Sequence, residues 1–291
     1  MMTNQQALQR LKSDILMRGL SPSTQKVYLR QVRLFLEQSK RPIEELDETD
    51  ARSYLERMVA ESGLAPKTIN QYVCAIRFFF AVTLNRYMNY LQFPHMKVPK
   101  KLPGIMTRDE VAQLISRTVN VKHRALLLIA YGSGLRINEL AVLKTADIDS
   151  KSMRVSVHLG KGQKDRYTIL SESALHTLRD YWRAYRPKSP EGYLFPGSKN
   201  IGHISDDAVY HAVKLAASRA GITANVTPHT LRHCFATHLL EDGYSLLQIK
   251  EMLGHASIQS TMIYLRLSNN TSDVTSPADN LPEMCEDCAY D

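Results

Sequence analysis

Several sequence features that identify common classes of protein are rare or absent in this sequence of 291 residues. It has four cysteines and one tryptophan, and its longest apolar run, Ala125 to Tyr131, is far shorter than the ~20 residues that cross a bilayer as a helix. The first dozen residues are polar, so we expect no signal peptide. Few cysteines, in helical or acidic surroundings, are typical of a reduced, cytoplasmic protein. These absences exclude a disulfide-rich secreted domain and argue against a membrane protein.

Acidic residues are outnumbered by basic ones, and the imbalance is uneven along the chain. There are 37 Lys and Arg against 29 Asp and Glu, a net charge of +8, yet residues 271–291 hold six acidic residues and no basic ones. The preceding 270 residues therefore carry +14. A basic body of this size is typical of proteins that bind nucleic acid, although ribosomal, membrane-surface and other soluble proteins share it.

The length and the 44% hydrophobic content predict two domains with buried cores. In the first hundred residues, apolar residues recur at helical spacing in four segments, with proline or glycine between them. Four short amphipathic helices predict a small bundle. Residues 94–104, rich in proline and lysine, predict a linker. The four predicted helices span about residues 5–18, 22–36, 49–62 and 65–80.

The second predicted domain, which begins near residue 105, mixes helices with a short β segment. Thr107 to Glu110 has a capping-box pattern that starts a helix, and two strand-like segments, 154–159 and 165–170, flank a Gly-Lys-Gly turn. We therefore predict a mainly α fold with a small β-sheet in the C-terminal domain. Further helices are expected at about residues 121–131, 136–143, 172–185, 206–220, 228–240, 245–253 and 259–265. The predicted organisation is a helical domain (1–93), the linker (94–104), a second domain (105–268) and a flexible acidic tail (269–291).

Two predicted helix starts hold arginines that suit an anion. Arg136 follows a glycine-bearing turn, and His229 and Arg232 lie three residues apart on one face of a helix N-terminus, where the helix dipole favours negative charge. A guanidinium binds phosphate through two parallel hydrogen bonds. Each pattern is weak by itself, because Arg136 could pair with Glu139 or Glu110 instead, and a His and an Arg at this spacing are often ordinary surface residues.

Two further places hold candidate residues. Lys161 lies between two glycines at the predicted turn and could reach a neighbouring phosphate, or be an ordinary turn charge, as Lys164 and Arg166 could be. His255 follows a glycine that reads as a helix C-cap. Tyr264 comes nine residues later in a short apolar helix, where a tyrosine that belongs to the core is the commoner outcome.

Taken together, these residues resemble one family. The order Arg136, Lys161, His229, Arg232, His255 and Tyr264 is similar to that of tyrosine recombinases, or phage integrases, and closest to compact Xer-type and mobile-element members. The matching stretches are GSGLRINEL, GKGQKDRYTIL, PHTLRHCFATHLL and LGHASIQSTMIY, and the resemblance covers about residues 5–268. It implies that residues 1–93 are the four-helix core-binding (SAM-like) domain and that residues 105–268 are the catalytic domain.

The resemblance also implies an activity. Tyr264 would attack a phosphate of duplex DNA, which leaves a 3′-phosphotyrosyl link and a free 5′-hydroxyl, and a second strand would reverse the attack. The chain would be a site-specific recombinase that integrates, excises or resolves a DNA element. The implied partners are duplex recombination sites and other copies of the same chain, which would form a synaptic tetramer on DNA. The resemblance also allows for an accessory DNA-bending or directionality protein.

The remaining family residues fit physical roles in that reaction. Negative charge grows on the phosphate oxygens in the transition state, and fixed donors that point at it lower the barrier. The resemblance makes Arg136 and Arg232 the bidentate clamp, with His255 as a further donor. His229 would take or share the tyrosine proton, and Lys161 would protonate the departing oxygen.

Two alternatives compete with a recombinase: a type IB topoisomerase-like enzyme that relaxes a single duplex, and a non-catalytic DNA-binding module of the same fold. We expect no cofactor and no metal. A metal-dependent nuclease would need converging carboxylates, which the motifs lack, and Cys285 and Cys288 supply two ligands where structural zinc takes four.

Overall fold

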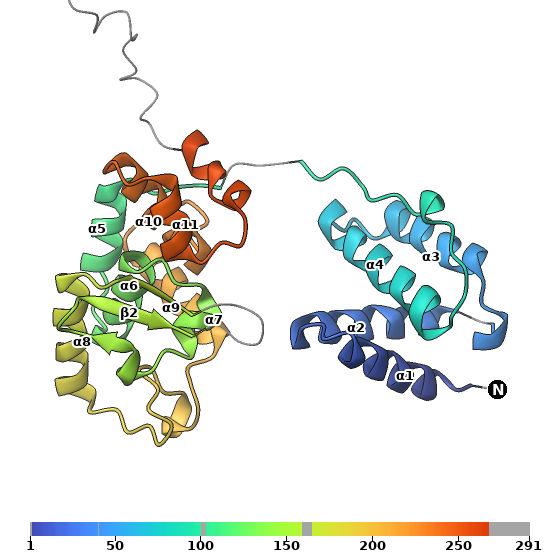
Figure 1. The fold of residues 1–291 in the computed structure, drawn as a ribbon, viewed down its shortest axis with the longest axis horizontal. Helices are drawn as coiled ribbons and strands as arrows, with labels where there is room; N and C mark the ends of the chain where they lie inside the picture. The colour runs from blue at the N-terminus through green and yellow to red at the C-terminus, as the bar shows by residue number, and fades with distance from the viewer. Residues whose placement is uncertain (1, 40, 100–102, 159–164, 268–291) are drawn as a thin grey trace, which may run out of the picture. The chain divides into compact units, whose positions relative to one another are not determined.

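The structure is a computed structural model, and it describes residues 2–39, 41–99, 103–158 and 165–267. The chain divides into two compact units, Met1–Lys101 and Leu102–Asp291 (Figure 1). Within the described ranges, no helix combines the length and the apolar character that a membrane span requires.

The first unit is a bundle of four helices, and side chains cap the starts of the first three. Thr3 caps the first helix in a capping box, Ser21 caps the second with Pro22 at its first position, and Asp47 caps the third. The apolar stripes meet in an aromatic core, where the ring of Phe35 packs against those of Tyr54 and Phe80. The predicted four-helix bundle is thus confirmed, with α1 at Asn4–Met17, α2 at Pro22–Gln38, α3 at Glu48–Glu61 and α4 at Pro66–Phe78.

The second unit is built around helix α6 (Val121–Gly132), which packs against α8 (Glu172–Tyr185) and α10 (Pro228–Glu241) (Figure 1). Helix α6 is apolar on most sides, which is typical of a helix buried in a core. The mainly helical fold that the sequence predicts is confirmed. The remaining helices are α5 (Arg108–Ser116), α7 (Ile137–Ala141), α9 (Asp206–Arg219) and α11 (Leu246–Leu253).

A small antiparallel sheet with the order β1-β2-β3 completes the second unit: β1 (Ile148–Asp149), β2 (Arg154–Val157) and β3 (Arg166–Ile169). The two longer strands agree with the prediction, whereas the two-residue strand β1 was not predicted because it is too short to show an alternating pattern. The predicted turn at residues 160–162 lies outside the described residues. Opposite Val157, the inward-facing position of β3 is Arg166, and β3 lies against α11.

The last described segment differs in type from its prediction. The helical piece expected at 259–265 consists of two 3₁₀ turns, η6 (Ile258–Ser260) and η7 (Met262–Arg266). The backbone N–H of Tyr264 donates to the carbonyl of Thr261, which is the tighter 3₁₀ pattern. This tighter turn places Tyr264 against α10 and α11, with 1% of the residue exposed.

Candidate functional site

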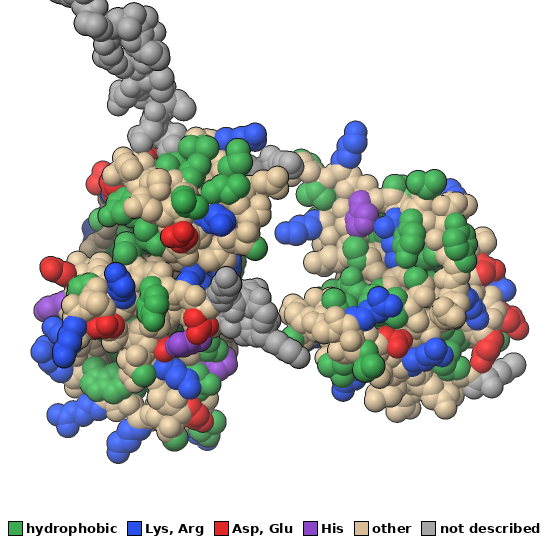
Figure 2. All heavy atoms as spheres, viewed as in Figure 1, with side chains coloured by type: hydrophobic (Ala, Val, Ile, Leu, Met, Phe, Trp, Pro, Cys, Tyr) green, Lys and Arg blue, Asp and Glu red, His purple; other side chains and the backbone are tan. Residues whose placement is uncertain are grey.

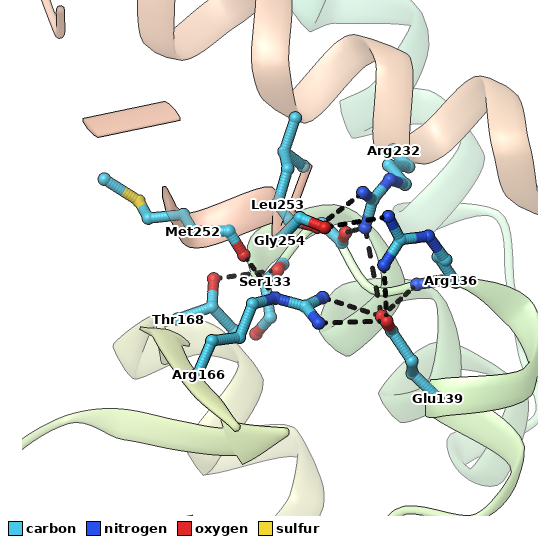
Figure 3. Close-up of polar contacts among 10 residues, drawn as sticks. Ser133, Arg136, Glu139, Arg166, Thr168, Arg232, Met252, Leu253 and Gly254 are labelled. Atoms are coloured by element: carbon cyan, nitrogen blue, oxygen red, sulfur yellow. Dashed lines mark hydrogen bonds and ion pairs between the residues drawn. The ribbon is translucent and has the colours of Figure 1, made fainter. Parts of the chain in front are cut away.

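Three arginines from three elements converge on one carboxylate, that of Glu139 in α7 (Figure 3). Arg166 of β3 donates from Nη1 to Oε1 at 2.9 Å and from Nη2 to Oε2 at 2.7 Å. Arg136 donates from Nη1 at 2.7 Å and from its backbone N–H at 2.8 Å. Nη1 of Arg232 lies 3.9 Å from Oε2. The carboxylate therefore links the start of α7 to the sheet and to α10.

Glu139 is ionised despite its burial. Burial by itself would raise the pKa of Glu139, but the hydrogen bonds from Arg166 and from the backbone of Arg136 outweigh it and lower this pKa to about 2. Burial, together with the nearby charge of Arg136, lowers the pKa of Arg232 to about 10, so that Arg232 stays charged at neutral pH. Three cations thus surround one anion, and the excess positive charge favours an anionic ligand such as a phosphate.

The same arginines hold the end of α11 through backbone carbonyls (Figure 3). Arg166 donates from Nε to the carbonyl of Met252 at 2.8 Å, and Arg232 donates from Nη2 to that of Leu253 at 2.7 Å. Arg136 donates to the carbonyl of Gly254 at 3.2 Å. These bonds satisfy carbonyls that a helix C-terminus leaves without intrahelical partners. They also fix the chain that leads to His255 and Tyr264.

Gly254 is required by this arrangement. It adopts φ +63°, in the left-handed region where other L residues are strained, and it caps α11. A Cβ atom at this position would also lie 2.8 Å from Cδ of Arg166. The glycine thus lets the guanidinium of Arg166 pass close to the backbone on its way to Glu139.

Tyr264 is enclosed by two histidines. Its hydroxyl forms a 3.2 Å hydrogen bond with Nδ1 of His233, and its ring is stacked on that of His255 at an interplanar angle of 10°. His255 is itself fixed by a 3.0 Å hydrogen bond between its Nδ1 and the hydroxyl of Thr261. A phenol, two imidazoles and the arginine cluster therefore form one continuous site.

Burial and the cations set the protonation of these groups in opposite directions. Burial raises the pKa of Tyr264, while Arg232 and Arg136 act to lower it. Burial lowers the pKa of His233 to about 4, helped by His229 and Arg232, and burial with Arg232 and Arg136 lowers that of His255 to about 4. At neutral pH the phenol is protonated and both imidazoles are uncharged.

The structure brings together four of the six residues that the motifs singled out: Arg136, Arg232, His255 and Tyr264. His229 lies in the first turn of α10, with its ring centroid 5.1 Å from that of His233. Lys161 lies outside the described residues. Among the described residues, no group of three or more His, Cys, Asp or Glu side chains is arranged to hold a metal ion.

Sequence reasoning missed two members of the site and undervalued a third. The turn pattern offers Arg166 only as a possible turn charge, although Arg166 shares the inward face of its strand with Thr168, and this alternation is the available signal. His233 lies one helical turn after His229, a spacing that puts both on one face. For Glu139 the sequence suggests a pairing with Arg136 but not the two hydrogen bonds from Arg166.

The two units match two family models. Residues 105–271 match the model described as "Phage integrase family", and residues 7–90 match "Phage integrase, N-terminal SAM-like domain". The chain belongs to the phage integrase family. The first match contains every residue of the site, so this integrase-family chain has its arginine cluster and its buried tyrosine in the part that defines the family.

Individual relatives agree with this membership. A Sinorhizobium fredii (strain NGR234) protein named as an integrase/recombinase, y4qK, is 44% identical over 94% of this chain and 89% of its own. The tyrosine recombinase XerA of Pyrococcus horikoshii is 32% identical over 91% and 90%. A solved structure of the Tn1549 transposon integrase with circular intermediate DNA has the same fold, with a TM-score of 0.71 and 20% identity over 89% of this chain and 94% of that one. The integrase-family chain is a tyrosine site-specific recombinase.

Proposed function

We propose that Tyr264 is the nucleophile of this recombinase and that it cuts and rejoins duplex DNA through a 3′-phosphotyrosyl intermediate. The observation that carries the proposal is the placement of a single buried phenol next to a cluster with excess positive charge, close enough for Arg232 and Arg136 to act on its pKa. A phosphodiester bound by that cluster would lie beside the hydroxyl. The phenolate that forms would be stabilised by the same cations.

The two clamp arginines differ in how they would contact the phosphate. The side chain of Arg136 is 36% exposed, so its guanidinium has a face open to a ligand. Arg232 is 2% exposed and donates to the carbonyls of Gly134 and Leu253, yet each Nη carries two hydrogens, which leaves donors for a phosphate oxygen. We therefore propose that Arg136 makes the first contact with the phosphate. Arg232, which the fold holds in place, would then donate from a fixed position.

The remaining roles complete the reaction. His255, fixed by Thr261, would donate to a non-bridging oxygen from its second ring nitrogen. Lys161 would protonate the departing 5′-oxygen, and His229 would lie beside the path of the tyrosine proton. The energy of the broken phosphodiester bond is kept in the tyrosyl link, so the rejoining step requires no nucleotide cofactor.

Duplex DNA is the proposed partner, with a synaptic tetramer as the working assembly and the cytoplasm as the location. Figure 2 shows Lys and Arg side chains on the surfaces of both units. The net charge of +8 supports a polyanionic partner. The named relatives are integrases and recombinases, and the Tn1549 integrase was solved with DNA, which favours recombination over relaxation of a single duplex.

The test is capture of the covalent intermediate on nicked suicide duplexes made from the DNA that flanks the gene. The wild-type chain should form an adduct that resists denaturation, and Tyr264→Phe should abolish it while DNA binding stays within about twofold. Tyr131→Phe is the matched control, because it removes the hydroxyl of a half-buried tyrosine in the same unit, one that is bonded to His238. An adduct that persists in Tyr264→Phe would contradict the assignment.

A plasmid-relaxation assay distinguishes a recombinase from the alternative, a topoisomerase-like enzyme. A recombinase should need its cognate site, whereas a topoisomerase-like enzyme would relax a plasmid that lacks one. Relaxation at equal rates with and without the site would favour the topoisomerase-like activity.

A further inference from the structure

The hydroxyl of Tyr264 is already hydrogen-bonded, and its partner is His233 rather than His229. His233 lies in the second turn of α10, its Nδ1 is 3.2 Å from the hydroxyl, and the two ring centroids are 5.7 Å apart. The ring of His255 lies nearly parallel to that of Tyr264, with the centroids 6.4 Å apart, and its own Nδ1 bonds to Thr261. The contact that reaches the reactive oxygen therefore comes from a histidine that is not among the six residues the motifs singled out.

The groups around His233 set its protonation state before DNA binds. The groups that face it are His229 and Arg232 on its own helix, Tyr264 on η7 and His255 after α11. Burial and the positive neighbours lower the pKa of His233 to about 4, so the imidazole is neutral at pH 7 and Nδ1 can accept a hydrogen bond from the phenol. A phosphodiester bound at the arginines would offset their charge and make a protonated imidazole less costly.

We propose that His233 is a catalytic residue of the recombination reaction, which takes the Tyr264 proton onto Nδ1 as the tyrosine attacks DNA. The phenol O–H bond breaks as an Nδ1–H bond forms, the phenolate oxygen bonds to phosphorus, and the bond to the 5′-oxygen breaks. The departing oxygen takes a proton from the general acid of the proposed function. Rejoining runs in reverse, and His233 returns the proton to Tyr264.

This inference rests on the proposed function of Tyr264 but makes a separate claim about proton transfer. If His233 accepts the proton, the cost of losing it must depend on how acidic the phenol is, because a more acidic phenol needs less help from a base. A histidine that only packs against the ring would show no such dependence. The dependence is therefore the property to measure.

The experiment incorporates 3,5-difluorotyrosine, a more acidic phenol, at position 264 and measures single-turnover adduct formation on the suicide duplex. With ordinary tyrosine, His233→Gln should slow adduct formation about 10²–10⁴-fold. With difluorotyrosine the loss should shrink by at least about tenfold. DNA binding should stay unchanged in both backgrounds.

His238→Gln is the matched control. His238 lies on the same helix, is buried, and also bonds a tyrosine hydroxyl, that of Tyr131 at 2.8 Å, but it belongs to no part of the proposed site. Its effect on the rate should be the same with either phenol. If His233→Gln fails to fold, His233→Ala with added imidazole gives a second measurement, in which rescue that increases with imidazole concentration supports the proposal.

The outcomes separate the two claims. An adduct that still forms in Tyr264→Phe contradicts the proposed function itself. If Tyr264→Phe is inactive while His233→Gln retains the wild-type rate, or loses the same factor with both phenols, only the role of His233 is overturned. If the phenol-dependent loss appears in His229→Gln instead, the proton passes to His229, as the family resemblance implies.

Discussion

At the scale of single residues, the carboxylate of Glu139 balances part of the positive charge of the buried arginines when no ligand is bound. Glu139→Gln would leave Arg166 buried with no charge to balance it, and breaking a buried pair in this way costs about 3–5 kcal/mol. Urea unfolding should show this loss. Asp180→Asn is the control, because it removes an exposed ion pair with Arg183 from the same unit and should cost less than about 1 kcal/mol. Equal losses would contradict the role of Glu139.

The same carboxylate should make stability depend on acid. Because the pKa of Glu139 falls from 4.5 to about 2 in the folded chain, the unfolded state binds the proton first as the pH drops. The stabilisation is fully present above pH 4.5 and is lost as the pH falls towards 2. Melting temperatures between pH 7 and pH 3 should therefore converge for the wild type and Glu139→Gln, and a constant gap would contradict this.

The residues of the site differ in how well the sequence reveals them. Arg136, Arg232 and His255 follow or begin helices beside glycine or proline, so local pattern and family order locate them. Arg166 and His233 owe their importance to partners 27 and 31 positions away. A sequence shows that such residues are polar, but it does not show which distant group removes them from water.

At the scale of elements, the end of α11 depends on one glycine. Gly254→Ala should lose about 1–2 kcal/mol from its φ of +63° alone, and more because the new Cβ displaces Arg166. Gly243→Ala is the control: its φ is +87°, and nothing lies within 4 Å of a Cβ there. The melting temperature and the rate of adduct formation should both fall further in Gly254→Ala than in Gly243→Ala. Equal effects would show that Arg166 does not need to pass close to the backbone at residue 254.

Element boundaries followed the strength of local signals. The capping box of Thr107 and Glu110 starts α5 at the expected place, because both side chains bond to the backbone of this one turn. The 3₁₀ turns around Tyr264 were not predicted, since α and 3₁₀ helices share the same apolar spacing over five residues. Packing against α10 and α11 selects the tighter turn, and packing is not visible in a local pattern.

At the scale of the whole molecule, charge should control DNA affinity. If about 6–10 phosphates are contacted, affinity should fall about 10³–10⁵-fold between 50 and 200 mM salt. Removal of residues 271–291, which carry six acidic side chains and no basic ones, should tighten binding most at low salt. Fluorescence anisotropy on a fixed duplex measures both effects, and a salt-independent affinity would contradict DNA binding through phosphates.

Arg232 has both a structural role and a proposed catalytic role, and this affects the design of an inactive variant that stays bound to its DNA substrate. Its guanidinium ties the carbonyl of Gly134 to that of Leu253 from inside the fold, so its removal damages the scaffold together with the chemistry. Tyr264→Phe deletes one oxygen atom and leaves every guanidinium bond in place. A dead-enzyme reagent for structural work should therefore be made at the nucleophile and not at the clamp.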